Sequence, residues 1–421
     1  MRASLVCRTL AAAALVGLSA CNSDSGLTPA PEHTFSAQMG GEGTLVVDND
    51  RADCPQADFN SIQAAVLAAQ PGDKILVCRG DYLETVLVEK ADLRIEAKGA
   101  PGEVVLQGTA AQPYGIHLRN TTGVLLQGFR VEGYADANII VEGGSRNTLR
   151  QNVATAGVVD GIEVLNSSAN VIDQNISFAN ASPVGDGFFV WQGSSDNIIR
   201  HNEMFENGQH GINLSGSGAG NVVFGNRAHH NRVRGIQNTL QSNGNVIENN
   251  HVFANGLIPV PSIAGVGVGI SVINSNNVIV RNNRSANNGS NGIGLNGASS
   301  NVVTNNRSIS NNMAGIAFNG ASNNLVENNE LFQNGGSGIQ FTNNADANTV
   351  RLNLIRLSGV DGIRVNDAAS AENTIERNIM RENVEHDAHD NSAGPGTGGT
   401  ANFWINNKCE TDNRGGSLCE H

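Results

Sequence analysis

Aromatic and charged residues are scarce in this chain of 421 residues, where they make up 4% and 15% of the sequence. So few aromatic rings argue against one large globular core, because such cores depend on large side chains. Low charge combined with 39% hydrophobic residues also argues against an intrinsically disordered chain. The formal net charge is −13, because 39 acidic residues outnumber 26 basic ones. A nucleic-acid-binding surface, which needs a basic excess, is therefore not expected.

Long hydrophobic runs are also missing, and the longest apolar stretch near the N-terminus, Leu10 to Leu18, is too short to span a bilayer. This stretch follows two arginines and ends at Leu18-Ser19-Ala20-Cys21, which resembles the bacterial lipobox. We therefore expect a signal peptide at residues 1–20, acylation of Cys21 and a flexible lipidated tether at 21–43. The lipid anchor alone would then hold the protein at a bacterial membrane, on the periplasmic face or the cell surface. The alternative is an ordinary cleaved signal with an incidental cysteine.

Cysteine is rare as well, and no Cys-x-x-Cys pair occurs. Beyond the signal region four cysteines remain, with Cys54 and Cys78 near one end of the folded region and Cys409 and Cys419 near the other. An even number in an exported protein favours local disulfides over a metal site. We expect these disulfides to pin both ends of the fold.

Glycine and asparagine are abundant, and asparagine outnumbers even the 50 glycines. From Tyr114 onward a glycine or its equivalent is followed by an apolar, a variable and another apolar residue, about every 23 residues. This phrase begins at Gly115, Asn138, Gly161, Gly187, Gly211, Gly235, Gly269, Gly292, Gly315, Gly338 and Gly362. The alternation within each repeat predicts three short strands, which form one coil of a parallel β-helix.

Asparagines recur in step with these repeats, in two rows that include Asn170, Asn197 and Asn277 in one and Asn202 and Asn226 in the other. Asparagine tolerates the left-handed backbone of a tight turn, and its amide can bond to the turns above and below. We therefore assign most of the asparagines to the scaffold.

The two ends of a solenoid must be covered, because an open coil exposes unpaired strands. Residues Phe59–Ala69 predict a short amphipathic helix, stopped by Pro71-Gly72-Asp73, that caps the first coil. We expect a cap and first coils at 44–113, β-helix repeats at 114–386 and a C-terminal cap at 387–421. In that last segment Phe403 and Trp404 are candidates to plug the final coil.

These segments together resemble the right-handed parallel β-helix repeat proteins of the pectin-lyase-like superfamily. The resemblance rests on the Phe59–Val66 entry segment, on repeats of the Asp-Gly-Ile-x-Val type and on Thr397–Trp404. It implies an all-β, right-handed parallel β-helix of about 11 or more coils. It does not fix the function, because the superfamily includes polysaccharide lyases, hydrolases, epimerases and non-enzymes.

One row of residues departs from the scaffold pattern. The residue before the repeated glycine is Asp160, Asp186, His210 and Arg234 on four successive coils, whereas later coils have bland residues there. A carboxylate or imidazole can transfer a proton, and an arginine can neutralise a uronate carboxylate. We expect Asp186 or His210 to transfer the proton and Arg234 to neutralise charge. Asp160 and Glu163 would be the ligands of a cation, such as calcium, or of a sugar hydroxyl.

Outward residues on the same strands complete the candidate site. Trp191 can stack on a sugar ring, and its neighbours offer amides and a carboxylate. The predicted substrate-binding residues are Glu163, Phe189, Trp191, Asn213 and Gln237. The alternative interpretation is that the aspartates are turn residues, since Asp-Gly is a favoured turn dipeptide and recurs at Asp361-Gly362.

Two further segments stand out without defining a site. The coil after Gly235 is about 10 residues too long, which predicts an inserted loop at Gly256–Ser262. Residues Glu385–Asp390 contain metal-binding residue types, but residue types without geometry leave the metal unknown.

The sequence thus predicts an exported, lipid-anchored monomer that either binds or both binds and processes an extracellular acidic polysaccharide. If it is an enzyme, we expect a lyase or C5-epimerase. No nucleic-acid partner is expected. The alternative is a non-catalytic structural or adhesion module at the cell surface.

Overall fold

The computed structural model describes residues 43–181, 183–258 and 266–420. The predicted signal peptide, Cys21 and all of the tether except Gly43 lie outside these ranges, as does much of the predicted inserted loop. Within the described ranges, no helix has the length and apolar character needed to cross a membrane.

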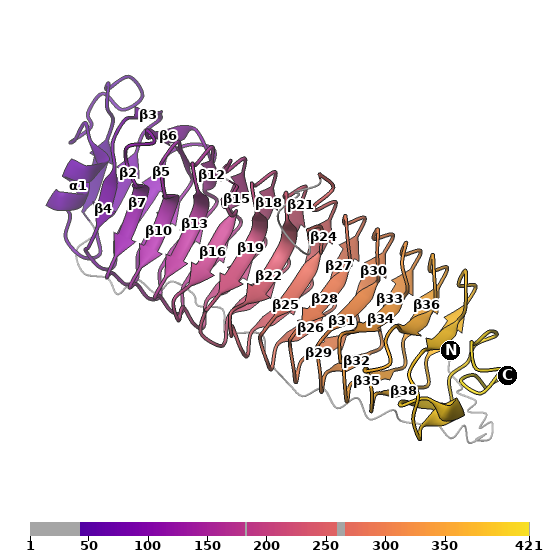
Figure 1. Cartoon of the computed structure of the whole chain (residues 1–421). Helices are drawn as coiled ribbons and strands as arrows, with labels where there is room; N and C mark the ends of the chain where they lie inside the picture. The colour runs from indigo at the N-terminus through magenta and orange to yellow at the C-terminus, as the bar shows by residue number, and fades with distance from the viewer. Residues whose placement is uncertain (1–42, 182, 259–265, 421) are drawn as a thin grey trace, which may run out of the picture. The chain divides into compact units, whose positions relative to one another are not determined.

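The described chain forms a parallel β-helix in which each coil adds one short strand to each of three sheets (Figure 1). All strand pairings are parallel, and each strand pairs with its equivalent one coil later. The inward positions match from coil to coil, as in the register Ile116↔Ile139↔Ile162. Two of the sheets contain 13 strands, which confirms the predicted solenoid of 11 or more coils.

Sheet A, with 15 strands, contains the strand that precedes the first coils and the one that follows the last. Its strands, in spatial order, are β1 (Thr44–Val47), β2 (Lys74–Val77), β5 (Arg94–Ala97), β8 (Leu125–Gln127), β11 (Thr148–Arg150), β14 (Val171–Asp173), β17 (Ile198–Arg200), β20 (Val222–Phe224), β23 (Val246–Glu248), β26 (Ile279–Arg281), β29 (Val302–Thr304), β32 (Leu325–Glu327), β35 (Thr349–Arg351), β38 (Thr374–Glu376) and β41 (Phe403–Ile405).

Sheet B has 13 strands of three or four residues. They are β3 (Gly80–Tyr82), β6 (Val104–Gln107), β9 (Phe129–Glu132), β12 (Val153–Thr155), β15 (Ile176–Phe178), β18 (Glu203–Phe205), β21 (Arg227–His229), β24 (His251–Phe253), β27 (Arg284–Ala286), β30 (Arg307–Ile309), β33 (Glu330–Phe332), β36 (Leu354–Arg356) and β39 (Ile379–Arg381).

Sheet C, also with 13 strands, carries the repeated glycine phrase and the candidate site. Its strands are β4 (Val86–Val88), β7 (Tyr114–Arg119), β10 (Ala137–Glu142), β13 (Asp160–Leu165), β16 (Phe188–Trp191), β19 (His210–Ser215), β22 (Arg234–Thr239), β25 (Ile270–Ile273), β28 (Ile293–Asn296), β31 (Ile316–Asn319), β34 (Ile339–Thr342), β37 (Ile363–Val365) and β40 (Ala388–Asp390).

Buried asparagines form ladders along the coils, as the sequence predicts, in which a side-chain Oδ1, such as that of Asn226, accepts from both the side-chain amide and the backbone N–H of the asparagine one coil earlier. In one ladder the Asn226 Nδ2 donates to the Asn250 Oδ1 at 3.1 Å and to the Ile199 carbonyl at 2.8 Å. The left-handed backbone lies one residue earlier, for example at Asn249 with φ 56°. A third ladder, from Asn180 through Asn207 to Asn231, was not predicted. Asn277 is exposed and belongs to no ladder, since the buried Val278 occupies that place.

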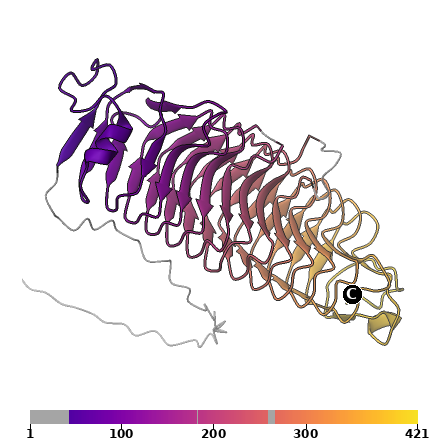
Figure 2. The same cartoon turned by 60° about the vertical axis from the view of Figure 1, so that its left-hand side comes forward.

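The predicted N-terminal helix cap is confirmed by α1 (Ile62–Ala68), which lies against the first coils (Figure 2). The helix starts there because the Ser61 hydroxyl accepts from the Ala64 N–H, and the Glu84 carboxylate accepts from two further N–H groups. Its buried side, including Ile62 and Val66, faces the core.

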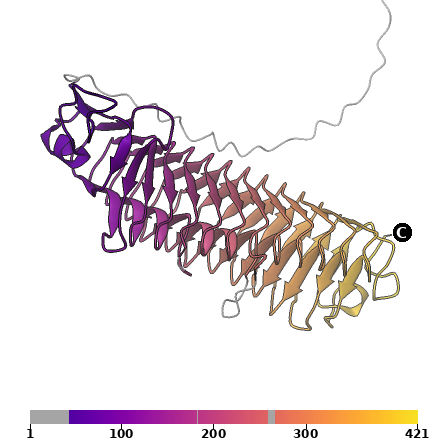
Figure 3. The same ribbon diagram turned by 90° about the horizontal axis from the view of Figure 1, so that it is seen from above.

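The C-terminal end is covered by Trp404, which is buried and donates from Nε1 to the Asp390 Oδ2 at 2.8 Å. Phe403, the other predicted plug, is 45% exposed, so that part of the prediction is wrong. The two residues are neighbours on strand β41, where successive side chains point to opposite faces, so Trp404 points inward and Phe403 outward. The coils between the two caps follow one another in chain order (Figure 3).

Disulfides join Cys54 to Cys78 and Cys409 to Cys419, one near each end of the solenoid. Both pairings confirm the expectation from the sequence.

Candidate active site

The residues before the repeated glycine stand at the edge of sheet C on consecutive coils. Asp186 precedes β16, His210 begins β19 and Arg234 begins β22, with His210 and Arg234 directly opposite each other. Glycine must follow each of them because the chain turns a crowded corner there. A Cβ on Gly211, for example, would lie 2.7 Å from the Gly235 carbonyl oxygen and 2.9 Å from the Ala228 Cβ.

Five of the predicted site residues form a closed cycle of polar contacts, which we call the five-residue ring. The Asp186 Oδ1 accepts from the His210 Nδ1 at 2.8 Å, and the Asp186 Oδ2 accepts from the Asn213 Nδ2 at 2.8 Å. The Gln237 Nε2 donates to the Asn213 Oδ1 at 3.0 Å, and its Oε1 accepts from the Arg234 Nη1 at 2.5 Å. The Arg234 Nη1 closes the cycle 3.3 Å from the His210 Nε2.

This arrangement determines which imidazole nitrogen carries the proton. A guanidinium can only donate, so the His210 Nε2 that faces Arg234 must present its lone pair. The proton of the neutral ring then lies on Nδ1, where Asp186 accepts it. A carboxylate that holds an imidazole in this tautomer leaves the far nitrogen ready to act as a general base.

Asp160 is attached to the five-residue ring through its neighbour, because the Asp186 N–H donates to the Asp160 Oδ1 at 2.7 Å. Burial and the negative charge of Asp186 raise the pKa of the Asp160 carboxyl well above its ordinary value. Burial also lowers the pKa of the Arg234 guanidinium. The environments of Asp160 and Arg234, at the two ends of the row, therefore both disfavour the charged form of the side chain.

The raised pKa of Asp160 predicts a pH-dependent stability effect of Asp160→Asn. The unfolded carboxyl titrates near pH 3.9, so the native protein loses stability as the pH rises from about 4 through the higher native pKa. The amide keeps the acceptor for Asp186 but cannot ionise. We expect Asp160→Asn to be more stable than the wild type at pH 7, and the difference to shrink toward about pH 4.

Urea unfolding at both pH values measures this effect, with the exposed Asp53→Asn as a control that should differ little from the wild type. A destabilised Asp160→Asn protein at pH 7 would contradict the account of Asp160.

A second group, on β13 and β16, carries the aromatic side chains. The Trp191 Nε1 donates to the Glu163 Oε1 at 2.5 Å, and the Phe189 and Trp191 rings stack with centroids 5.2 Å apart. Both rings are partly exposed. Burial raises the pKa of Glu163, against the hydrogen bond from Trp191. In the strand pairing of sheet C, Glu163 lies opposite Phe189, and Phe189 lies opposite Asn213. This aromatic group therefore adjoins the five-residue ring.

The structure therefore brings all nine predicted catalytic and substrate-binding residues to one stretch of sheet C. Their exposure is lower than a groove would suggest, since Asp186 and His210 are each only 2% exposed. The Arg234 guanidinium lies against the His210 Nε2, so a substrate would reach this nitrogen from that side only if Arg234 moved.

Three of the four carboxylate oxygens of Asp160 and Asp186 already accept hydrogen bonds from protein donors. The Asp186 oxygens accept from His210 and Asn213, and the Asp160 Oδ1 accepts from the Asp186 N–H. A calcium ion shared between these carboxylates would have to displace those donors, so the residues present do not form a ready calcium site.

Sequence reasoning missed one arrangement on the same sheet. Asp361, cited above as a recurrence of the Asp-Gly turn dipeptide, lies in the row before the glycine, one coil from His386. On the strands that follow, Arg364 lies opposite His389. Counting one repeat from Asp361 would have revealed the pairing, because the two residues share a position in successive coils.

Comparison with known proteins identifies the fold. A family model described as the right handed beta helix region matches residues 114–268 and 261–410. The chain belongs to the right-handed β-helix family. No curated protein sequence matches this β-helix chain.

Solved structures of other β-helices are similar in fold. The A-module of a mannuronan C-5 epimerase from Azotobacter vinelandii is 17% identical, with a TM-score of 0.54 over 69% of this chain and 94% of that module. The catalytic domain of an α-1,3-glucanase is 13% identical, with a TM-score of 0.52 over 81% of this chain and 64% of that domain. At these identities the likeness shows the fold alone.

Proposed function

We propose that this right-handed β-helix protein binds an acidic polysaccharide on sheet C and removes the C5 proton of a uronate unit, as a lyase or C5-epimerase does. The observation that carries the proposal is the five-residue ring, in which Asp186 orients the His210 imidazole and Arg234 covers its Nε2. The epimerase and the glucanase that share the fold are both named for polysaccharides, which supports a polysaccharide substrate without specifying an acidic one.

The ring suggests how the substrate would open the site. A uronate carboxylate is a better partner for a guanidinium than the Gln237 amide, because it offers two charged oxygens to the planar fork. Pairing with the substrate would draw Arg234 away from the His210 Nε2 and at the same time neutralise the carboxylate next to C5. The exposed imidazole nitrogen would then take the C5 proton, Asp186 would stabilise the imidazolium, and the C–H electron pair would pass into the neutralised carboxylate as an enolate. In a lyase this pair would form the C4–C5 double bond and expel the C4 oxygen, which takes a proton from water or the imidazolium. In an epimerase C5 would regain a proton from water on the opposite face.

The stacked Phe189 and Trp191 rings provide a surface for the neighbouring sugar. Export and lipid anchoring through Cys21 belong to this proposal too, and they are supported by the N-terminal sequence.

A non-catalytic adhesion module is the second candidate, and the burial of His210 is the observation that favours it. The two candidates differ in turnover: an adhesion module binds oligosaccharides on sheet C without changing them.

Trp191→Ala tests the sugar-binding part of the proposal. Loss of the stacked ring should weaken binding of uronate oligosaccharides by about 2- to 12-fold, which corresponds to the ~0.5–1.5 kcal/mol of an aromatic contact beyond its buried area. Isothermal titration calorimetry with defined oligomers of several uronates measures this. Phe332→Ala, a partly exposed ring on sheet B, is the matched control and should bind as the wild type does. Equal binding by all three proteins would move the sugar site away from Trp191.

A further inference from the structure

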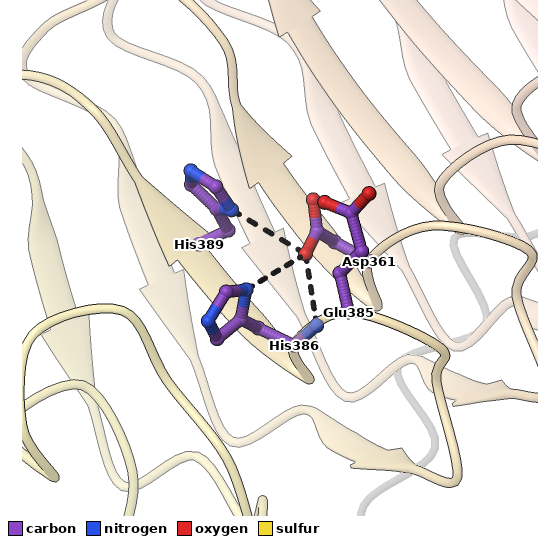
Figure 4. Close-up of side chains that lie close together, drawn as sticks. All are labelled: Asp361, Glu385, His386 and His389. Atoms are coloured by element: carbon purple, nitrogen blue, oxygen red, sulfur yellow. Dashed lines mark hydrogen bonds and ion pairs between the residues drawn. The ribbon is translucent and has the colours of Figure 1, made fainter.

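A second cluster of polar side chains lies near the C-terminal end of sheet C, around Asp361. Its carboxylate is fully buried, at 0% exposure, while His386 and His389 approach it from the next coil (Figure 4). The Nδ1 atoms of both imidazoles lie 3.4 Å from the same carboxylate oxygen, Oδ1, which also accepts from the His386 backbone N–H at 3.0 Å and has a further lone pair for an ion. Glu385 offers a further carboxylate, and one ligand atom of each of the four residues lies within 4.8 Å of the others.

The two imidazole nitrogens are buried, and among the described residues neither has a hydrogen-bond partner. Buried polar nitrogens are normally satisfied, so two such atoms that face one oxygen need an explanation. Figure 4 shows both imidazoles turned toward the carboxylate of Asp361. Protonated rings would be expected to close to about 2.7–2.9 Å as charge-assisted donors, whereas both stay at 3.4 Å.

The spacing matches the ligands of a metal ion. Bonds of about 2.0–2.1 Å to nitrogen and oxygen in a tetrahedral site put the ligand atoms about 3.3–3.4 Å apart. This is the separation observed between the Asp361 Oδ1 and each Nδ1. The geometry points to a divalent transition-metal site, which we propose binds Zn²⁺ through Asp361, His386 and His389, with Glu385 as the fourth ligand.

The residue types select the class of ion. Imidazole nitrogens with carboxylates suit Zn²⁺ and its neighbours in the transition series, whereas Ca²⁺ and Mg²⁺ prefer oxygen ligands. Arg364 completes the arrangement, because its Nη1 donates to the Asp361 Oδ2 at 2.9 Å and so orients the carboxylate with Oδ1 toward the imidazoles. Such partners around a ligand are a usual part of metal sites. The Arg364 Nη1 is also 3.3 Å from the Glu385 Oε2, a contact that metal binding would replace.

This site is separate from the five-residue ring and does not depend on the proposed function. The ring involves β16, β19 and β22, whereas the second cluster involves β37 and β40. A second pair of histidines, His229 and His230 on and beside β21, provides an internal comparison. Their Nδ1 atoms face each other at 2.9 Å and share no carboxylate oxygen, although the His229 Nε2 contacts the Glu203 Oε1 at 3.1 Å.

Titration of the metal-stripped chain with Zn²⁺ in a calorimeter tests the proposal, with Ca²⁺ as the contrasting ion. We expect one Zn²⁺ per chain and no detectable Ca²⁺ binding at this site. His386→Gln and His389→Gln should each weaken Zn²⁺ binding by at least about tenfold, because even loss of a partner behind a ligand costs that much. Co²⁺ in place of Zn²⁺ should give the visible absorption of a four-coordinate ion, and each variant should lose it.

The paired substitution His229→Gln with His230→Gln is the matched control and should leave Zn²⁺ binding unchanged. Glu385→Gln, on a half-exposed side chain, should also weaken binding and covers the case in which a histidine variant does not fold. Absence of Zn²⁺ binding to the wild type would overturn the site. So would binding that survives all three cluster variants or that is lost in the control.

Discussion

His210→Gln should lower the turnover of a uronate polysaccharide by about 10³-fold, within the 10²–10⁴ range of general acid–base catalysis, and leave its binding nearly unchanged. Glutamine can still donate to Asp186 and accept from Arg234, so the five-residue ring stays intact. The substitution removes the imidazole Nε2, which carries the basic lone pair that His210 supplies. Initial rates at several substrate concentrations separate the expected fall in kcat from KM.

Asp186→Asn provides an independent check on the same step. Asparagine introduces an amide N–H where the Asp186 carboxylate accepts from two sides. Either the His210 tautomer must switch, which removes the free lone pair at Nε2, or the Asn213 amide must reverse. We expect a comparable loss of kcat. His251→Gln, on sheet B, is the control, and full activity of His210→Gln would assign the proton transfer to another group.

Asn226→Ala should destabilise the protein by at least about 3 kcal/mol. The Asn226 amide serves a fully buried ladder: its Oδ1 accepts from the Asn202 backbone and side chain, and its Nδ2 donates to Asn250 and to the Ile199 carbonyl. Alanine leaves several of these groups unsatisfied, at a cost of about 1–3 kcal/mol each. Because each coil contacts only its neighbours, the loss of stability should be concentrated in the coils next to Asn226, near the centre of the solenoid.

Urea unfolding followed by circular dichroism measures this loss. Asn312→Ala, at an exposed asparagine, should change stability by no more than about 0.5 kcal/mol. If the two alanine variants unfold alike, the ladders do not contribute to stability in the way their hydrogen bonds indicate.

The fold could be predicted because the sequence repeats it. Each coil restates the glycine phrase, so an error in one repeat, such as the placement of Asn277, leaves the others unaffected. The amide ladders were only partly predicted, because a periodic asparagine does not tell whether its backbone or its side chain is needed. The backbone angles show that the left-handed residue is its predecessor, for example Asn249 before Asn250.

The candidate site could be predicted as a set of residues and not as a set of contacts. Asp186, His210 and Arg234 attract attention because they interrupt a bland row. That Asn213 and Gln237 close a ring with them depends on rotamers and register, which the sequence does not contain. Asp361 stood out only as part of a recurring Asp-Gly turn dipeptide for the same reason: its partner His386 is a neighbour only once the coils are stacked.

Proton loss at C5 of the sugar tests the central proposal most directly. The wild type is incubated with uronate polysaccharides in D₂O, and the C5 position is followed by nuclear magnetic resonance. A lyase removes this proton as the double bond forms, and an epimerase exchanges it for deuterium, so one measurement detects both. We predict loss of the C5 proton signal with the wild type and not with His210→Gln. Full retention of that signal with the wild type on every uronate would contradict the proposed chemistry.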